Sequence, residues 1–183
     1  MKILAIPATN SIKGLNFQLL TYAAKEIDGG LIPGAEVEFI DINDYETVIF
    51  SPQREEADGI PALAQQLFDK LGAADALMFS FAEHNGSFTA GWKNLHDWMS
   101  RIEMEIYQDK PVVMFGATPG GRAAAGVLGS ATTSAPFFGA NLVASLGVGS
   151  FFDTFDSEAG EIKDPELKAK FLEALASLGK ALS

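Results

Sequence analysis

The 183-residue sequence contains no cysteine and only two histidines. Structural zinc sites and cysteine nucleophiles are therefore excluded, because both depend on thiolates or clustered imidazoles. Basic residues are also few, since 13 Lys and Arg stand against 24 Asp and Glu and leave a net charge of -11. This acidity argues against nucleic acid as a partner, because binding to a phosphate backbone relies on clustered Lys and Arg.

Long apolar runs are missing as well. No stretch approaches the roughly 20 apolar residues that a membrane-spanning helix needs, so no membrane partner is expected. The apolar start at residues 1–7 is too short for a secretory signal. Apolar residues make up 48% of the chain and charged residues 20%, which is typical of a globular protein with a sizeable core. We expect one domain over residues 1–183 and a cytoplasmic location.

Apolar runs typical of buried strands alternate along the chain with helical patterns. The strands are predicted at residues 3–7, 37–42, 76–81, 111–117 and 142–148. Helices are predicted from Phe17 to the Gly29-Gly30 pair, from Pro61 to Gly72, around 92–102, and after an Asp164 N-cap, while 43–60 is expected to be irregular. This order predicts an α/β fold with a doubly wound parallel sheet.

Ligands of such sheets bind at the carboxyl ends of the strands, so the loops after the first, third and fourth strands are the places to look. The first loop, residues 8–16, is rich in hydroxyl and amide side chains. Backbone N–H groups there, with the hydroxyls of Thr9 and Ser11, would form a cradle for a phosphate. A plain polar turn with Asn16 as helix N-cap explains the same residues equally well. Neither G-x-G-x-x-G nor a Walker lysine is present, which disfavours a dinucleotide or a nucleoside triphosphate at this loop.

The second loop follows the third strand and consists of Ala82, Glu83, His84, Asn85, Gly86 and Ser87. Its polar side chains suit hydrogen bonds to a flat ligand with polar edges, and its glycine permits close approach of the backbone. A surface histidine is the simpler explanation for His84 taken alone.

The third loop follows the fourth strand and consists of Thr118, Pro119, Gly120, Gly121 and Arg122. Its glycines leave backbone amides open, and its arginine offers a cation to an anionic partner. An ordinary strand-to-helix turn with a solvated arginine would look the same. Because all three loops are predicted at one edge of one sheet, a shared ligand is favoured over three unrelated turns.

With these loops identified, the sequence resembles the NADPH-dependent FMN reductase family over essentially its full length. The similarity is strongest in residues 82–101, which resemble the family's P-E-Y-N-G-S…K-N…D-W block through Ala82 to Ser87, Trp92, Lys93, Asn94, Asp97 and Trp98. Residues 118–122 are similar to an S-P-G-G-R loop. Thr9 and Asn16 match the first hydroxyl and the closing asparagine of the family's phosphate loop.

The sequence departs from the family pattern in two places. In the phosphate loop, Ser11 stands at the usual arginine and Gly14 at a usual serine. In the second loop, Ala82 and His84 replace the usual proline and tyrosine. A neutral donor at Ser11 therefore takes the place of a charge-assisted contact.

The resemblance implies a flavodoxin-like fold, with a five-stranded parallel sheet in the order 2-1-3-4-5. It implies FMN as cofactor, with the phosphate at Thr9, Ser11 and Asn16, next to Phe17, and the ring on loops 82–87 and 118–122. It further implies an NAD(P)H-dependent reductase that passes electrons through the flavin to a small acceptor such as a flavin, quinone, azo compound or metal oxyanion. No catalytic side chain is needed, because the flavin carries the chemistry. Family members form dimers, so a homodimer or homotetramer is expected.

Three other functions stay open at this point. A non-catalytic electron carrier resembling flavodoxin would suit the acidic surface, although loop 82–87 lacks paired aromatics to sandwich the ring. An FMN-binding or scaffold protein without redox function is compatible with the changed phosphate loop. A hydrolase using Ser80, His84 or Asp97 is disfavoured, because the G-x-S-x-G elbow is missing.

Overall fold

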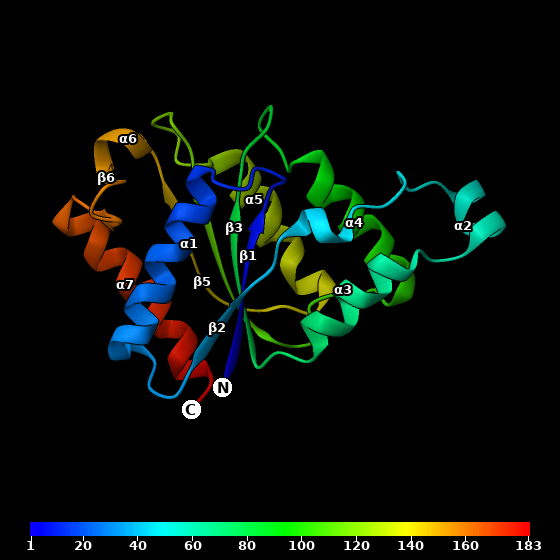
Figure 1. The fold of residues 1–183 in the computed structure, drawn as a ribbon, viewed down its shortest axis with the longest axis horizontal. Helices are drawn as coiled ribbons and strands as arrows, with labels where there is room; N and C mark the ends of the chain where they lie inside the picture. Colours follow the sequence, from blue (N-terminus) through cyan, green and yellow to red (C-terminus); the bar gives the residue numbers. More distant parts are fainter.

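A five-stranded parallel sheet in the order β2-β1-β3-β4-β5 forms the centre of the protein (Figure 1). The computed structural model describes residues 1–183. The strands are β1 (Lys2–Ala8), β2 (Glu36–Phe39), β3 (Ala76–Phe81), β4 (Pro111–Ala117) and β5 (Asn141–Val148). The predicted doubly wound sheet and its strand order are confirmed.

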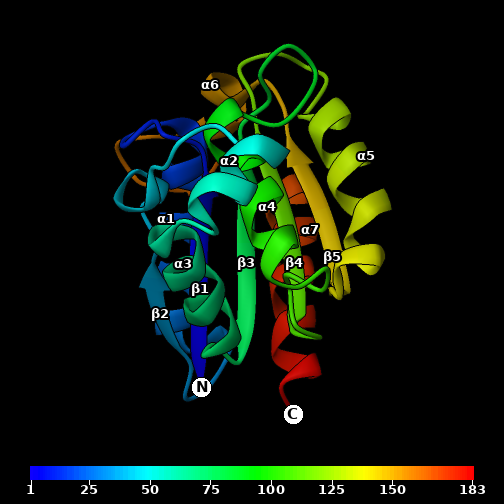
Figure 2. The ribbon, with the colours of Figure 1, turned by 90° about the vertical axis from the view of Figure 1, so that its right-hand side faces the viewer.

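Helices cover both faces of this sheet (Figures 1 and 2). On one face lie α1 (Leu15–Glu26) and α7 (Pro165–Ala181), and on the other lie α3 (Ala62–Gly72), α4 (Ala90–Ile102) and α5 (Ala125–Ser134). The central strands are therefore buried on both sides, which explains why their sequences are continuous apolar runs. As predicted, α7 begins after an Asp164 N-cap, whose carboxylate accepts from the Leu167 N–H at 2.6 Å.

The segment between β2 and α3 differs from its prediction. The second strand ends at Phe39, and Ile42–Tyr45 form the 3-10 helix η2, because the Asp41 side chain accepts from the Asn43 N–H at 2.9 Å and turns the chain. The segment expected to be irregular contains a short helix, α2 (Pro52–Asp58). Figure 1 shows α2 standing away from the body of the molecule.

The remaining elements are short. A π-helical turn, η1 (Ile27–Leu31), ends α1 where the glycine pair was expected, and Gly30 has a φ of 100° there. The 3-10 helix η3 (Ala135–Phe138) follows α5, while α6 (Phe151–Thr154), β6 (Phe155–Asp156) and β7 (Glu161–Ile162) lie between β5 and α7. None of the helices combines the length and apolar character that crossing a bilayer requires.

Candidate functional site

The loops after β1, β3 and β4 meet around a cavity of about 210 Å³. They converge because the carboxyl ends of parallel strands lie at the same edge of a sheet. The cavity is lined by Thr9, Ser11, Gly14, Leu15, Asn16, Ala82, Glu83, His84, Ala117, Thr118 and Pro119. The three loops picked from the sequence therefore do come together.

Some of the predicted residues lie outside this lining. The tips of two loops extend past it, namely Asn85, Gly86, Ser87, Gly120, Gly121 and Arg122. Phe17 packs with its ring 5.3 Å from that of Phe39 and lines an adjoining cavity, which shares Thr9 and Ser11 with the first one. Three lining residues, Gly14, Leu15 and Ala117, were not among the predicted site residues. Ala117 could have been, because the last residue of a central strand always lies at this edge.

The loop after β1, residues 9–14, which the family resemblance marks as a phosphate loop, presents an uninterrupted series of backbone donors. The N–H groups of residues 12–17 donate to no acceptor within the chain. They lead into the N-terminus of α1, where the helix dipole favours an anion. Gly14 is the N-cap, and a Cβ there would lie only 2.9 Å from the Ser11 Oγ. The glycine found where the family has serine therefore permits a tighter loop.

Asn16 is not the N-cap that the sequence suggested. It is the second residue of α1 and only 4% exposed, and its side chain points across the edge of the sheet. Its Oδ1 accepts from the Ala117 N–H at 2.8 Å and from the Ser80 hydroxyl at 2.7 Å, while its Nδ2 donates to the Ala117 carbonyl at 3.2 Å. The Asn16 side chain thus ties α1 to β3 and β4.

The second loop is a tight hairpin seated on the start of α5. His84 and Ser87 exchange two backbone hydrogen bonds, and Asn85 and Gly86 have φ of 52° and 77°, as in a type I′ turn. The Glu83 carboxylate accepts from the Val127 N–H at 2.9 Å and so supplies the N-terminus of α5 with a hydrogen-bond partner. The hairpin is therefore fixed in place.

The third loop leaves its glycine backbone uncovered. No atom lies within 4 Å of a Cβ built at Gly120, and the N–H groups of Gly120, Gly121 and Arg122 have no acceptor within the chain. The Ser150 N–H donates to the Gly120 carbonyl at 3.0 Å and so anchors the loop to the segment after β5. Arg122 forms no ion pair. A flat ligand can therefore approach the backbone closely at this loop.

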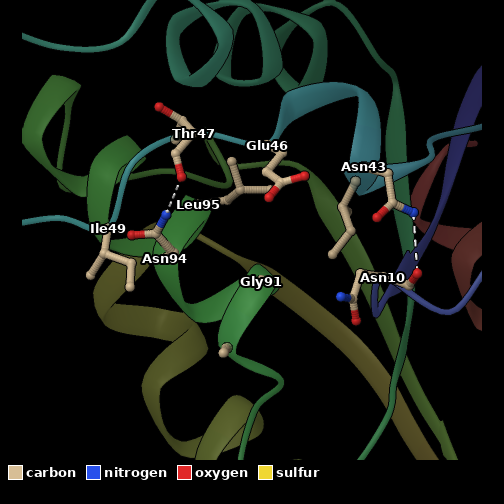
Figure 3. Close-up of a pocket in the computed structure, with 10 residues that line it drawn as sticks. Asn10, Asn43, Glu46, Thr47, Ile49, Gly91, Asn94 and Leu95 are labelled. Carbon is tan, nitrogen blue, oxygen red and sulfur yellow. Dashed lines mark hydrogen bonds between the residues drawn. The ribbon is translucent and has the colours of Figure 1, made fainter.

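A second cavity, of about 220 Å³, lies on the other side of the phosphate loop (Figure 3). Asn10 reaches it from that loop, and Glu46 and the first turn of α4 form other parts of its wall. The sequence did not point to this cavity, because its residues come from a segment expected to be irregular.

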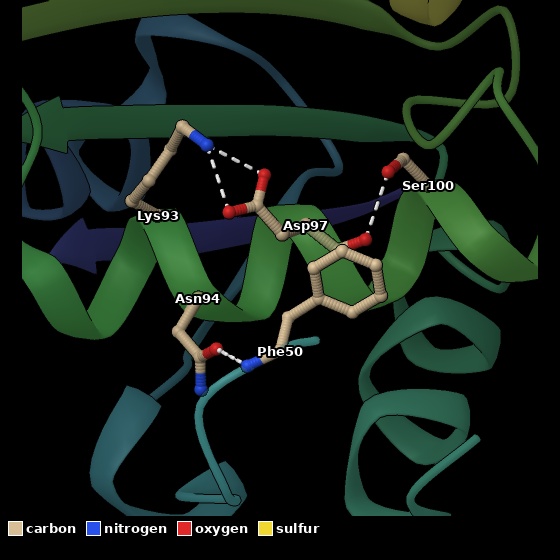
Figure 4. Close-up of polar contacts among 5 residues, drawn as sticks. All are labelled: Phe50, Lys93, Asn94, Asp97 and Ser100. Atoms are coloured by element: carbon tan, nitrogen blue, oxygen red, sulfur yellow. Dashed lines mark hydrogen bonds and ion pairs between the residues drawn. The ribbon is translucent and has the colours of Figure 1, made fainter. Parts of the chain in front are cut away.

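The side chains proposed for a hydrolase do not form a catalytic group. Ser80 is fully buried, and its hydroxyl donates to the Asn16 Oδ1 at 2.7 Å, so the hydroxyl is bonded to an amide oxygen and not to a general base. Asp97 is paired with Lys93 on the outside of α4, at 2.6 and 2.8 Å (Figure 4). No group of three or more His, Asp or Glu is placed to hold a metal ion. The site offers amide and hydroxyl donors, which suit a phosphate ester and a flat heterocycle.

Comparison with known proteins agrees with this chemistry. The sequence model of the NADPH-dependent FMN reductase family matches residues 1–153. The chain belongs to this family. The match includes all three loops of the site and all five strands of the central sheet.

Curated relatives carry reductase names. An NAD(P)H-dependent FMN reductase of Pseudomonas aeruginosa is 32% identical over 101 residues, which cover 54% of this chain and 51% of the relative. An NADPH:quinone oxidoreductase of Arabidopsis thaliana is 30% identical over 106 residues, covering 56% and 53%. The chain thus spans about half the length of the curated relatives it matches.

Solved structures of other proteins share the fold of this FMN reductase family member. The flavoenzyme NAD(P)H:(acceptor) oxidoreductase of Paracoccus denitrificans superposes with a TM-score of 0.76 at 19% identity, over 99% of this chain and 96% of the other. An azoreductase of Bacillus anthracis gives 0.70 at 19% identity, over 98% of both chains. At this identity the likeness concerns the flavodoxin-like architecture alone.

Proposed function

We propose that the protein is an NAD(P)H-dependent FMN-binding reductase that passes electrons from a nicotinamide through flavin to a small acceptor. The observation that carries the proposal is the cavity where three donor-rich loops meet in a member of the FMN reductase family. Bound FMN supplies the hydride and single-electron chemistry. Quinones and azo compounds are the acceptor classes that the names of similar proteins suggest.

The residues present fit FMN. The free N–H groups of residues 12–17, with the hydroxyls of Thr9 and Ser11, match the oxygens of a phosphate. Asn16 contributes through its backbone N–H, because its side chain is already bonded to β3 and β4. The open backbone at Gly120 suits a flat ring. We assign the polar contacts to that ring to His84, Asn85 and Ser87.

Restoring a cation to the phosphate loop is expected to strengthen FMN binding. Ser11→Arg should tighten the affinity for FMN by about tenfold, because a charge-assisted contact is roughly twice as strong as a neutral one. Riboflavin is the matched control ligand, since it lacks the phosphate, and its affinity should stay the same. Fluorescence-quenching titrations measure both. Equal effects on FMN and riboflavin would place Ser11 away from the phosphate.

A steady-state assay of NADH and NADPH oxidation, with FMN and a quinone present, tests the enzymatic function. Arg122→Ala should raise the KM for the nicotinamide coenzyme about tenfold and leave the KM for a neutral quinone unchanged, because the unpaired guanidinium would bind an anionic part of the coenzyme. Lys180→Ala removes the same charge at the far end of α7 and serves as control. Identical KM values for Arg122→Ala and Lys180→Ala would refute this role.

A second copy of the chain is part of the proposal. Helix α2 has no buried residue, and seven-residue helices are not stable by themselves in water, so a partner surface against it would stabilise it. Phe137 is 77% exposed and Val48 is 56% exposed, so burying these apolar side chains in an interface would stabilise a dimer. We therefore expect a homodimer, or a homotetramer built from it. Light scattering that reports a single chain would contradict this expectation.

We also propose a cytoplasmic location, because the proposed reductase needs NAD(P)H as its electron donor.

A further inference from the structure

The second cavity lies beside the proposed flavin site. Asn10, on its wall, directly follows Thr9, which lines the first cavity. The Asn43 Nδ2 donates to the Asn10 carbonyl at 3.2 Å, so η2 and the phosphate loop form one continuous wall (Figure 3). Helix α4, whose first turn closes the cavity, begins shortly after the hairpin at residues 84–87.

The outer wall of the cavity is held firmly against α4. The Asn94 Oδ1 accepts from the Phe50 N–H at 2.8 Å, and its Nδ2 donates to the Thr47 carbonyl at 3.2 Å (Figures 3 and 4). One helical turn later, the Trp98 Nε1 donates to the Val48 carbonyl at 2.8 Å. The cavity is therefore preformed, and both the oxygen and the nitrogen of the Asn94 side-chain amide are already hydrogen-bonded to this wall.

Three polar side chains in this cavity, those of Asn10, Glu46 and Thr47, have no partner within the chain. The Glu46 carboxylate forms neither an ion pair nor a hydrogen bond, and the Asn10 side-chain amide is also free. The N–H groups of Ala90 and Gly91, the first two residues of α4, have no acceptor in the chain either. The apolar part of the wall includes Ile49, which is 73% exposed. No lysine or arginine lines the cavity.

We propose that this cavity binds the adenosine half of NADH and that Glu46 selects NADH over NADPH. The proposal rests on the proposed reductase function and names its electron donor. A carboxylate accepts hydrogen bonds from both hydroxyls of an adenosine ribose, as acidic residues do in nucleotide-binding folds. Ile49 offers an apolar contact to the purine, and the Asn10 amide can pair with the purine's polar edge.

The proposal also accounts for the rest of the dinucleotide. The hairpin at residues 84–87, which precedes α4, is assigned to the flavin ring on which the nicotinamide must stack. Ala90 and Gly91, at the start of α4, line the same cavity as Glu46 and offer their free N–H groups to the diphosphate. The adenosine is assigned to the part of that cavity formed by Asn10, Glu46 and Ile49.

NADPH carries an additional phosphate on the same ribose, at the 2′ position. That phosphate would place negative charge beside the Glu46 carboxylate, with no cation in the cavity wall to offset it. Specificity is often built from such a repulsive element. The chain is therefore expected to prefer NADH, although the family description names NADPH.

The ratio of kcat/KM for NADH to kcat/KM for NADPH measures this preference. The unaltered protein should favour NADH by about tenfold or more, because hydrogen bonds to a charged group change affinity by that order. Glu46→Gln should lower the ratio about tenfold, and Glu46→Arg should invert it. Asp44→Asn is the control, since it also removes one carboxylate, two residues away in η2, but Asp44 lines another cavity. A ratio that Glu46→Gln and Asp44→Asn leave equally unchanged would overturn the proposal.

Calorimetry with ADP-ribose separates this proposal from the reductase function, because ADP-ribose carries no nicotinamide and cannot transfer a hydride. The purified protein should bind ADP-ribose about tenfold more tightly than its 2′-phosphorylated form, and Glu46→Gln should remove the difference. Equal affinities for the two ligands in the unaltered protein would overturn the selection by Glu46. Failure of both NADH and NADPH to reduce the FMN-loaded protein would instead refute the reductase function, and calorimetry would still decide on the cavity.

Discussion

Replacing Asn16 with alanine is expected to lower the free energy of unfolding by about 3 kcal/mol, because three buried hydrogen bonds lose their partner at once. The variant would leave three groups unpaired, namely the Ala117 N–H, the Ala117 carbonyl and the Ser80 hydroxyl. Water cannot easily replace the lost amide, because Asn16 is only 4% exposed. Urea unfolding measures the loss. Ser80→Ala is the matched control, since it removes one neutral hydrogen bond and should cost only about 1 kcal/mol.

The same variant distinguishes two roles for Asn16. If its side chain positions the loop, Asn16→Ala should weaken binding of FMN and riboflavin by similar factors. If its side chain contacts the phosphate, as the family resemblance implies, only FMN binding should weaken and the stability should barely change. Stability equal to that of the unaltered protein would contradict the network described here.

Acidification is expected to destabilise the protein through His96. Burial lowers the pKa of this imidazole to about 4. The ring of His96 packs 4.4 Å from that of Phe138. The charge of Asp97 raises the pKa in part, and that of Lys93 lowers it. The unfolded chain binds the proton with a pKa of about 6.5, so between the two values it takes up more protons than the folded chain. Stability should therefore fall as the pH drops from about 6.5 to 4, by about 3 kcal/mol in total.

The variant His96→Phe isolates this contribution, because carboxylates also titrate in the same range. Its unfolding free energy, measured in urea at pH 7 and near pH 4.5, should depend less on pH than that of the unaltered protein. His84→Gln, at the exposed hairpin, should keep the original dependence. Parallel pH curves for the unaltered protein and His96→Phe would show that His96 is not shielded from protonation.

The strands could be predicted because parallel strands covered on both faces leave continuous apolar runs in the sequence. The helix α2 was missed because it buries no residue, so its sequence shows no apolar periodicity. The strand β2 was predicted too long, since Ile42 is apolar but belongs to the 3-10 helix that Asp41 initiates.

The position of the site could be predicted because strand topology alone brings the three loops to one edge. The roles of single side chains could not. Asn16 looked like an N-cap, and its actual partner Ala117 lies 101 residues away in the sequence. The hydrogen bond from the Val127 N–H to Glu83 also joins segments that are far apart in the sequence. The same is true of the walls of the cavity beside Glu46. No local sequence pattern reveals such contacts.

The reductase function is tested most directly by mixing the FMN-loaded protein, without oxygen, with an excess of NADH or NADPH and following the flavin absorption. The band of oxidised flavin is expected to disappear within seconds and to return when a quinone or air is admitted. The result is expected because no atom lies within 4 Å of a Cβ built at Gly120, so the backbone there is open to a stacked ring, and holding a nicotinamide close to the flavin is most of what the enzyme must provide. A flavin that stays oxidised for minutes with both coenzymes, yet is reduced by dithionite, would contradict the account and indicate an electron carrier or an FMN-binding protein.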